Sequence, residues 1–129
     1  MRKKMDIFYY WFPPAAWMGV IFYMSSQRSI SITSHVTTDF VTFKTLHMVE
    51  YAFLFFFFFR AFQSLKYLKP NINALCSFCL TMFYSLTDEF HQLYIATRQG
   101  RFRDVLFDVV GILVMYVIIK KVRLIQKLL

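Results

Sequence analysis

Four apolar blocks alternate with short polar segments along the chain. They cover residues 7–24, 45–62, 72–86 and 105–119. This pattern is typical of a small polytopic membrane protein and not of an amphipathic globular one. At ~1.5 Å per residue the first two blocks rise about 27 Å and the last two about 22 Å, whereas a bilayer core needs about 30 Å. The two shorter blocks must therefore include flanking residues, and these flanks are rich in acidic side chains.

The composition of the 129-residue chain strengthens this interpretation. Apolar residues make up 58% of the chain and aromatic residues 21%, and only 17% are charged. A soluble domain of this length would carry about a quarter charged residues and would bury its apolar residues in one core. We therefore predict an all-α fold: a four-helix transmembrane bundle that forms a single domain over residues 1–129 and is surrounded by membrane lipids.

The positions of the basic residues predict the orientation in the membrane. The formal net charge of +8 suits either nucleic acid or a membrane surface. Here the basic residues flank apolar spans instead of covering one face, which argues against nucleic acid. With the N-terminus in the cytoplasm, ten of the fifteen Lys and Arg residues lie on the inner side. We therefore expect a multi-pass protein of the cell membrane with both termini cytoplasmic.

The first block has two interpretations. A basic segment precedes it, as in a signal peptide. Three further apolar blocks follow, however, and the aromatic run at residues 9–12 suits a membrane interface, so we interpret this block as an uncleaved signal anchor. Proline is tolerated best in the first turn of a helix. Pro13 and Pro14 therefore predict an interfacial segment up to Phe12 and a helix from about Pro14.

Polar and ionisable side chains recur at helical spacing in the last three blocks and at their ends. Those of the second block fan over about 120° of one helix face, and those near the end of the third form a similar stripe if the helix continues beyond Leu86. The stripes consist of Lys44, His47, Glu50 and Tyr51, of Tyr84, Asp88, His91 and Gln92, and of Asp104, Asp108 and Gly111. By the topology above, all three meet at the external end of the bundle.

Several of these residues are candidates for chemistry. Glu50 lies inside its block, where a carboxylate is costly unless it is paired, so it is a functional candidate or a structural ion-pair partner. Asp88, Glu89 and His91 form a cluster dense enough for a catalytic or binding site. Asp108 lies about one turn inside the last block and cannot stay charged and alone there, so we expect it to pair with Arg101, Lys44 or His47.

Metal and cysteine chemistry are weakly indicated. The spacing of His47 and Glu50 can place two metal ligands on one helix face, and His91 is a third candidate ligand, but such spacing is common by chance. Cys76 and Cys79 form a C-x-x-C that fits a redox pair or half a zinc site. No second pair follows, which favours two soft side chains in a membrane helix. We predict no cofactor.

The motifs together resemble the VanZ-like family, over most of the chain from Trp17 to Gly111. They read Phe22-Tyr23-Met24-Ser25-Ser26-Gln27, Lys44-x-x-His47-x-x-x-Tyr51, Asp88-Glu89-x-His91-Gln92 and Arg98-x-Gly100-Arg101-x-x-Asp104. A typical member is a small bacterial membrane protein, and the namesake is associated with resistance to teicoplanin. The resemblance implies that the signature positions here are Ser25, Ser26, Lys44, His47, Tyr51, Asp88, Glu89, His91, Gln92, Arg98, Arg101 and Asp104. Asp108 departs from the family, which commonly has Asn there.

Three functions fit these residues. In the first, the external cluster binds an anionic lipid or cell-wall precursor headgroup, with Arg98 and Arg101 either holding the anion or neutralising nearby acids. In the second, the protein is a membrane-embedded acid/base or metal-assisted enzyme acting on an envelope lipid, with Glu89 or His91 as general base and Lys44 or Arg98 stabilising charge. The third is a proton-coupled transporter or a subunit of a larger complex. Transport is disfavoured because the cytoplasmic halves of the second and last blocks lack ionisable residues before the terminal cations.

Overall fold

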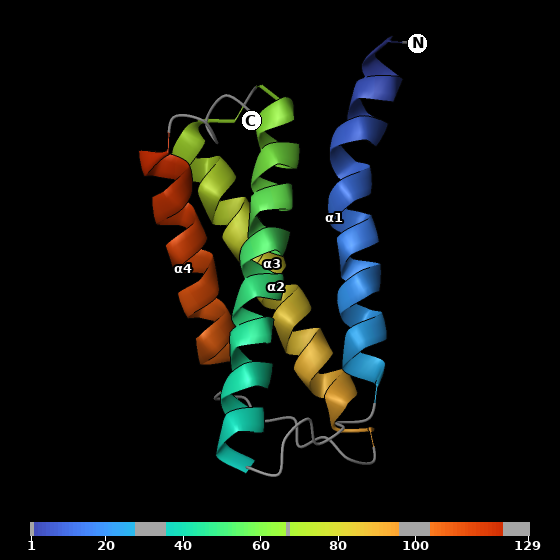
Figure 1. The fold of residues 1–129 in the computed structure, drawn as a ribbon. Helices are drawn as coiled ribbons and strands as arrows, with labels where there is room; N and C mark the ends of the chain where they lie inside the picture. Colours follow the sequence, from blue (N-terminus) through green and yellow to red (C-terminus); the bar gives the residue numbers. More distant parts are fainter. Residues whose placement is uncertain (1, 28–35, 67, 96–103, 123–129) are drawn as a thin grey trace.

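The protein is a bundle of helices. The computed structural model describes residues 2–27, 36–66, 68–95 and 104–122, and this part of the chain is helical with no strand. The all-α prediction is therefore confirmed for these residues. The helices run alternately down and up (Figure 1), so the end of α1, the start of α2, the end of α3 and the start of α4 meet at one end of the bundle. Their bounds are α1 Arg2–Ser26, α2 Val36–Ser64, α3 Pro70–Gln92 and α4 Val105–Lys121.

Each apolar block lies within one helix, but the helices are longer than the blocks. α2 begins at Val36, and α3 continues past Leu86 to Gln92, which places the polar stripe at its end on a helix. Among the helices that the structure describes, α2 is the one long and apolar enough to cross a membrane, over Val41–Ser64. α4 has 17 residues and so rises only about 26 Å.

The prediction for the first block was wrong at its prolines. Pro13 and Pro14 lie inside α1, which is one continuous helix and does not begin near Pro14. Proline cannot donate the backbone hydrogen bond to the carbonyl four residues earlier, so this turn is weakened. A contact from α2 supports the same turn. The Arg60 guanidinium lies 5.0 and 4.9 Å from the ring centroids of Tyr9 and Tyr10, and it donates a 3.2 Å hydrogen bond to the Tyr9 hydroxyl.

Replacing Arg60 with Met should lower the free energy of unfolding by about 1 kcal/mol, the usual contribution of a cation–π contact. Methionine keeps most of the aliphatic stem and removes the charge and the hydrogen bond to α1. Thermal unfolding of the detergent-solubilised full chain measures the effect. The matched control is Lys69→Gln, which removes an exposed charge at the same end of the bundle. Equal losses in the two variants would contradict a specific role for Arg60.

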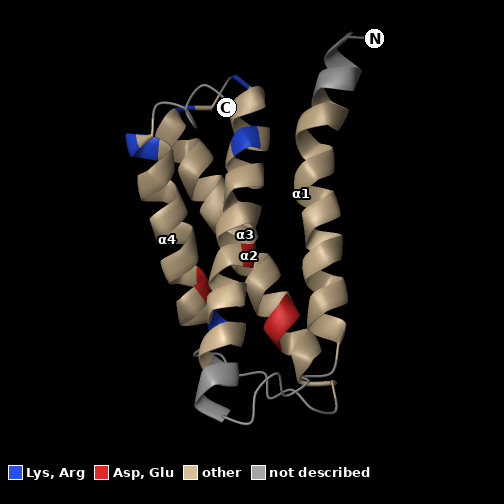
Figure 2. Ribbon diagram, viewed as in Figure 1, with Lys and Arg blue, Asp and Glu red and all other residues tan. Residues whose placement is uncertain are grey.

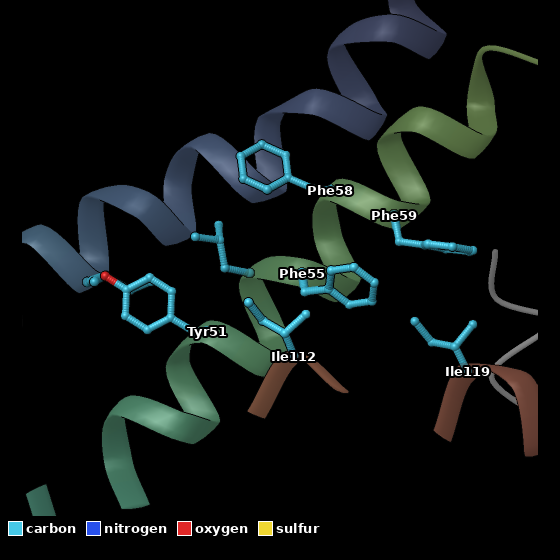
Figure 3. Close-up of a cluster of buried hydrophobic side chains, with 8 residues drawn as sticks. Tyr51, Phe55, Phe58, Phe59, Ile112 and Ile119 are labelled. Carbon is cyan, nitrogen blue, oxygen red and sulfur yellow. The ribbon is translucent and has the colours of Figure 1, made fainter. Parts of the chain in front are cut away.

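The apolar core lies mainly between α2 and α4. Figure 3 shows aromatic side chains of α2, including Tyr51 and Phe55, close to Ile112 of α4. Tyr51 and Phe55 are at most 1% exposed, as is Ile112. The two backbones approach closely at Gly111, which faces the main chain of Met48. A small residue at such a crossing lets two helices pack tightly.

The helix α3 has an inverted distribution of polar and apolar residues. Large apolar side chains on its outer face are exposed, for example Leu75 at 60% and Phe83 at 65%. The interior face is polar, and the buried residues of α3 are Asn73, Ser77, Thr81, Ser85, Asp88, Glu89 and Gln92. In a water-soluble bundle the opposite distribution is expected.

Candidate functional site

The acidic residues of the described bundle lie toward one of its ends. Figure 2 shows basic segments where α2 and α4 end and again near the start of α2, whereas the acidic segments lie on α2, α3 and α4 nearer the other end. This second end, where α1 and α3 finish and α2 and α4 begin, is called the polar end below. The structure therefore brings the three sequence stripes to the same end of the bundle, as expected.

The first part of the polar end joins α1 to α3. The Ser25 hydroxyl donates a 2.8 Å hydrogen bond to Oδ2 of Asp88. The Gln92 amide, one turn further along α3, donates a 2.9 Å hydrogen bond to the same oxygen and lies 3.5 Å from the Ser25 hydroxyl. All three side chains are buried. Two neutral donors thus orient one carboxylate oxygen, which is the usual way a buried carboxylate is accommodated.

The second part joins α3 to α4 and α2. Asp108 is 1% exposed, and its Oδ2 accepts a 2.6 Å hydrogen bond from the hydroxyl of Ser85. Nδ1 of His47 lies 3.9 Å from the other oxygen of Asp108, Oδ1. Of the partners expected for Asp108, the structure places His47 beside it. Ser85 was not anticipated, although its spacing from Gln92 puts both on the same face of α3.

The third part is an ion pair nearer the surface. Nζ of Lys44, on α2, lies 2.5 Å from Oδ2 of Asp104, which precedes α4. Their side chains are 17% and 9% exposed, so the pair is only partly shielded from its surroundings. Lys44 is therefore a cation of the polar end that is held by a carboxylate and is still partly exposed.

Tyr51 occupies the interior between these parts. Its ring stacks on His47 at a centroid distance of 6.1 Å, and Asp88 and Asp108 lie close enough to act on its hydroxyl electrostatically. Among the residues described, the Tyr51 hydroxyl and Oδ1 of Asp88 and of Asp108 make no close hydrogen bond, although Tyr51 faces Asp88 and His47 lies 3.9 Å from Asp108. These three atoms are the part of the network with hydrogen-bonding capacity left for a proton or a ligand.

The remaining candidates lie around this interior. Glu50 and Glu89 are buried, and the indole N–H of Trp17 donates a 2.9 Å hydrogen bond to the backbone oxygen of Glu50. The His91 ring stacks on Phe22 of α1 at 4.7 Å. The hydroxyl of Ser26, by contrast, is used within α1, where it donates to the Phe22 carbonyl. Arg98 and Arg101 lie outside the described residues.

A metal centre is not supported by this arrangement. Among the described residues, no group of three or more His, Cys, Asp or Glu side chains could hold a metal ion. The candidate ligands His47, Glu50 and His91 therefore form no such group. His47 instead faces Asp108, and the His91 ring contacts Phe22.

The sequence reasoning missed the buried polar row of α3. Asn73, Ser77, Thr81 and Ser85 recur every four residues, and this spacing was the available signal. The hydroxyls of Ser77 and Thr81 each donate a 2.7 Å hydrogen bond to the carbonyl four residues earlier. These bonds satisfy the hydroxyls of Ser77 and Thr81 within the helix, so these two residues can be buried without partners on other helices.

These features define a class: a small all-helical protein with an apolar exterior and a buried network of carboxylates, hydroxyls and one imidazole at one end. A protein-family model described as VanZ/LLP1 matches residues 10–126. The chain belongs to this family, which confirms the resemblance found in its motifs. No curated protein and no solved structure is similar enough to be matched to it.

Proposed function

We propose that the protein is a four-span membrane protein whose polar end faces the outside of the cell. The apolar outer face and polar inner face of α3 support this placement, because lipid stabilises exposed apolar side chains and disfavours exposed polar ones. α2 has the length and composition of a membrane span. The basic segments at the opposite end fit the cytoplasmic side. The short helix α4 then requires Asp104 and Asp108 to lie near the membrane boundary.

At its polar end the protein binds the headgroup of an envelope lipid or of a lipid-linked cell-wall precursor. The observation that carries this proposal is the convergence of four helices on one buried polar network, with the partly exposed Lys44 beside it. Lys44 pairs with an anionic group of the ligand, and the buried network holds the surrounding helix ends in place. A headgroup bound by this protein would be less accessible to lipoglycopeptides. This links the site to the teicoplanin resistance associated with the family's namesake.

A second function is favoured by one contact. The pair formed by His47 and Asp108, with Tyr51 stacked on the imidazole, resembles the base and orienting group of acid/base catalysis. In this alternative the bound headgroup is not only held but chemically altered, and His47 transfers the proton.

Replacing Lys44 with Gln should reduce the amount of bound envelope lipid by about tenfold, as expected for the loss of one charge-assisted hydrogen bond. The full chain is purified from bacterial membranes in mild detergent, and mass spectrometry of its lipid extract measures the bound molecules. Lys44→Arg keeps the charge and should retain binding. Lys121→Gln removes an exposed charge at the basic end and is the matched control.

Teicoplanin susceptibility of cells producing each variant provides the second measurement. We expect Lys44→Gln to lose protection, while Lys121→Gln keeps it. Unchanged lipid content together with unchanged susceptibility in Lys44→Gln would refute the binding function. A His47→Gln variant that retains the lipid but stops its conversion to a new species in the extract would establish the catalytic alternative.

A further inference from the structure

A surface pocket lies at the basic end of the bundle, opposite the end that carries the polar network (Figure 1). It is a pocket of about 180 Å³ formed where α2 ends, α3 begins and α4 ends. A cavity of about 150 Å³ holds a molecule the size of benzene, so this pocket has room for a phosphate group and the ester atoms next to it. The lining residues are Phe59, Gln63, Asn71, Tyr116, Ile119 and Lys120, together with Pro70.

The floor of this pocket is apolar and its rim is polar. Phe59 and Ile119 are 8% and 3% exposed and belong to the core of the bundle. Gln63, Asn71 and Lys120 are exposed at the rim. This division matches an amphipathic ligand, whose polar group meets the rim while its apolar part covers the floor.

One cation of the rim is held in place. Nζ of Lys120 lies 4.8 Å from the centroid of the Tyr116 ring, so the ammonium is positioned above an aromatic wall of the pocket. A cation fixed in this way loses less conformational entropy on binding an anion than a freely moving lysine would. Lys120 therefore places positive charge at a defined point of the pocket and not merely somewhere on the surface.

The charged residues in the three segments that form the pocket are all basic. The last turns of α2, from Phe55 onward, the first turns of α3, up to Leu80, and α4 from Gly111 onward contain no Asp or Glu. Lys66, Lys69 and Lys121 are exposed nearby in the chain. Pro70, the first residue of α3, has no N–H group. The backbone N–H groups that follow it, from Asn71 on, give the start of this helix a partial positive charge. The local field favours an anion over a neutral or cationic ligand.

We propose that this pocket binds the phosphate-bearing headgroup of an anionic phospholipid of the cytoplasmic leaflet. The phosphate lies against the Lys120 ammonium and the backbone N–H of Asn71. The glycerol and the first acyl carbons cover Phe59 and Ile119. The inference depends on the membrane placement proposed above, because that placement puts the basic end at the cytoplasmic surface. It does not depend on the ligand of the polar end.

The test uses the full chain in vesicles of either phosphatidylglycerol mixed with phosphatidylcholine or phosphatidylcholine alone. Native mass spectrometry of the protein released from them counts bound phosphatidylglycerol. We expect Lys120→Gln to reduce this binding about fivefold, as expected for the loss of one direct contact between the ammonium and the phosphate. Lys121→Gln, which removes the neighbouring charge outside the pocket lining, should leave most of it. Inorganic phosphate added to the vesicles should not compete, because it cannot cover the apolar floor.

Each outcome decides the proposal. Equal losses in Lys120→Gln and Lys121→Gln would show a diffuse charge effect and overturn the pocket as a site, as would full competition by inorganic phosphate. Flotation of the vesicles checks insertion separately, and a chain that does not float with them would overturn the membrane placement and this inference together. Lys44→Gln, measured in parallel, reports the phosphatidylglycerol held at the polar end, and the roughly fivefold effect of Lys120→Gln should persist when it is combined with Lys44→Gln. A failure of the polar-end function therefore leaves this result unaffected.

Discussion

Replacing Gly111 with Ala is expected to lower the free energy of unfolding by about 3 kcal/mol, at the upper end of the usual range for overpacking a tight contact. A Cβ atom at this position would come within 2.9 Å of the Met48 carbonyl carbon and closer still to its oxygen. Both atoms belong to the backbone of α2, so they cannot move aside as a flexible side chain can. The helices α2 and α4 must separate instead, and the core between them loosens.

The chain contains a matched control for this substitution. A Cβ atom at Gly19, within α1, would meet nothing within 4 Å. Gly19→Ala should therefore raise stability by up to about 1 kcal/mol, because alanine is the better helix former. Thermal unfolding of both variants in the same detergent gives the comparison. A Gly111→Ala protein as stable as the Gly19→Ala protein would show that α2 and α4 do not approach as closely as the structure places them.

Replacing Asp88 with Ala is expected to cost a similar amount, about 3 kcal/mol, because two buried donors lose their acceptor. The hydroxyl of Ser25 and the amide of Gln92 both bond to one Asp88 oxygen. The loss separates α1 from α3 at the polar end, so the lipid bound at that end should also be lost. Thermal unfolding and lipid content of the purified full chain measure the two effects.

Two further variants distinguish the loss of this hydrogen-bond network from a general loss of stability. Thr87 is exposed and bonds only to the Tyr84 carbonyl within α3, so Thr87→Ala should change stability by less than about 0.5 kcal/mol. The double variant with Ser25→Ala should be less destabilised than the sum of the single variants, since both remove the same hydrogen bond. Strict additivity would rule out the coupling between α1 and α3.

The sequence was informative about the helices and about which end carries the site. Four uniform apolar blocks predicted four helices, and the spacing of Lys44, His47 and Tyr51 predicted one face of α2. These inferences depend only on local periodicity, which is a property of each segment by itself. They succeeded because a helix face is fixed by spacing before any helix packs against another.

The partners across helices could not be predicted in the same way. Asp108 was expected to meet a cation, and its closest hydrogen bond comes from Ser85 on α3. Which residue reaches it depends on the rotation and height of α3 relative to α4, and these are set by packing contacts such as the one between Gly111 and Met48. The contact that Arg60 makes with the turn before the prolines of α1 could not be predicted either, because it also comes from another helix.

In the membrane placement proposed above, the inverted face of α3 has a consequence for how the bundle assembles. A helix with seven polar residues on its interior face would expose that face to acyl chains if it entered the bilayer by itself. The preceding hairpin partner, α2, is apolar enough to insert independently and then shields part of that face. Translocation machinery should therefore release α2 and α3 into lipid as a pair, and α4 would complete the enclosure afterwards.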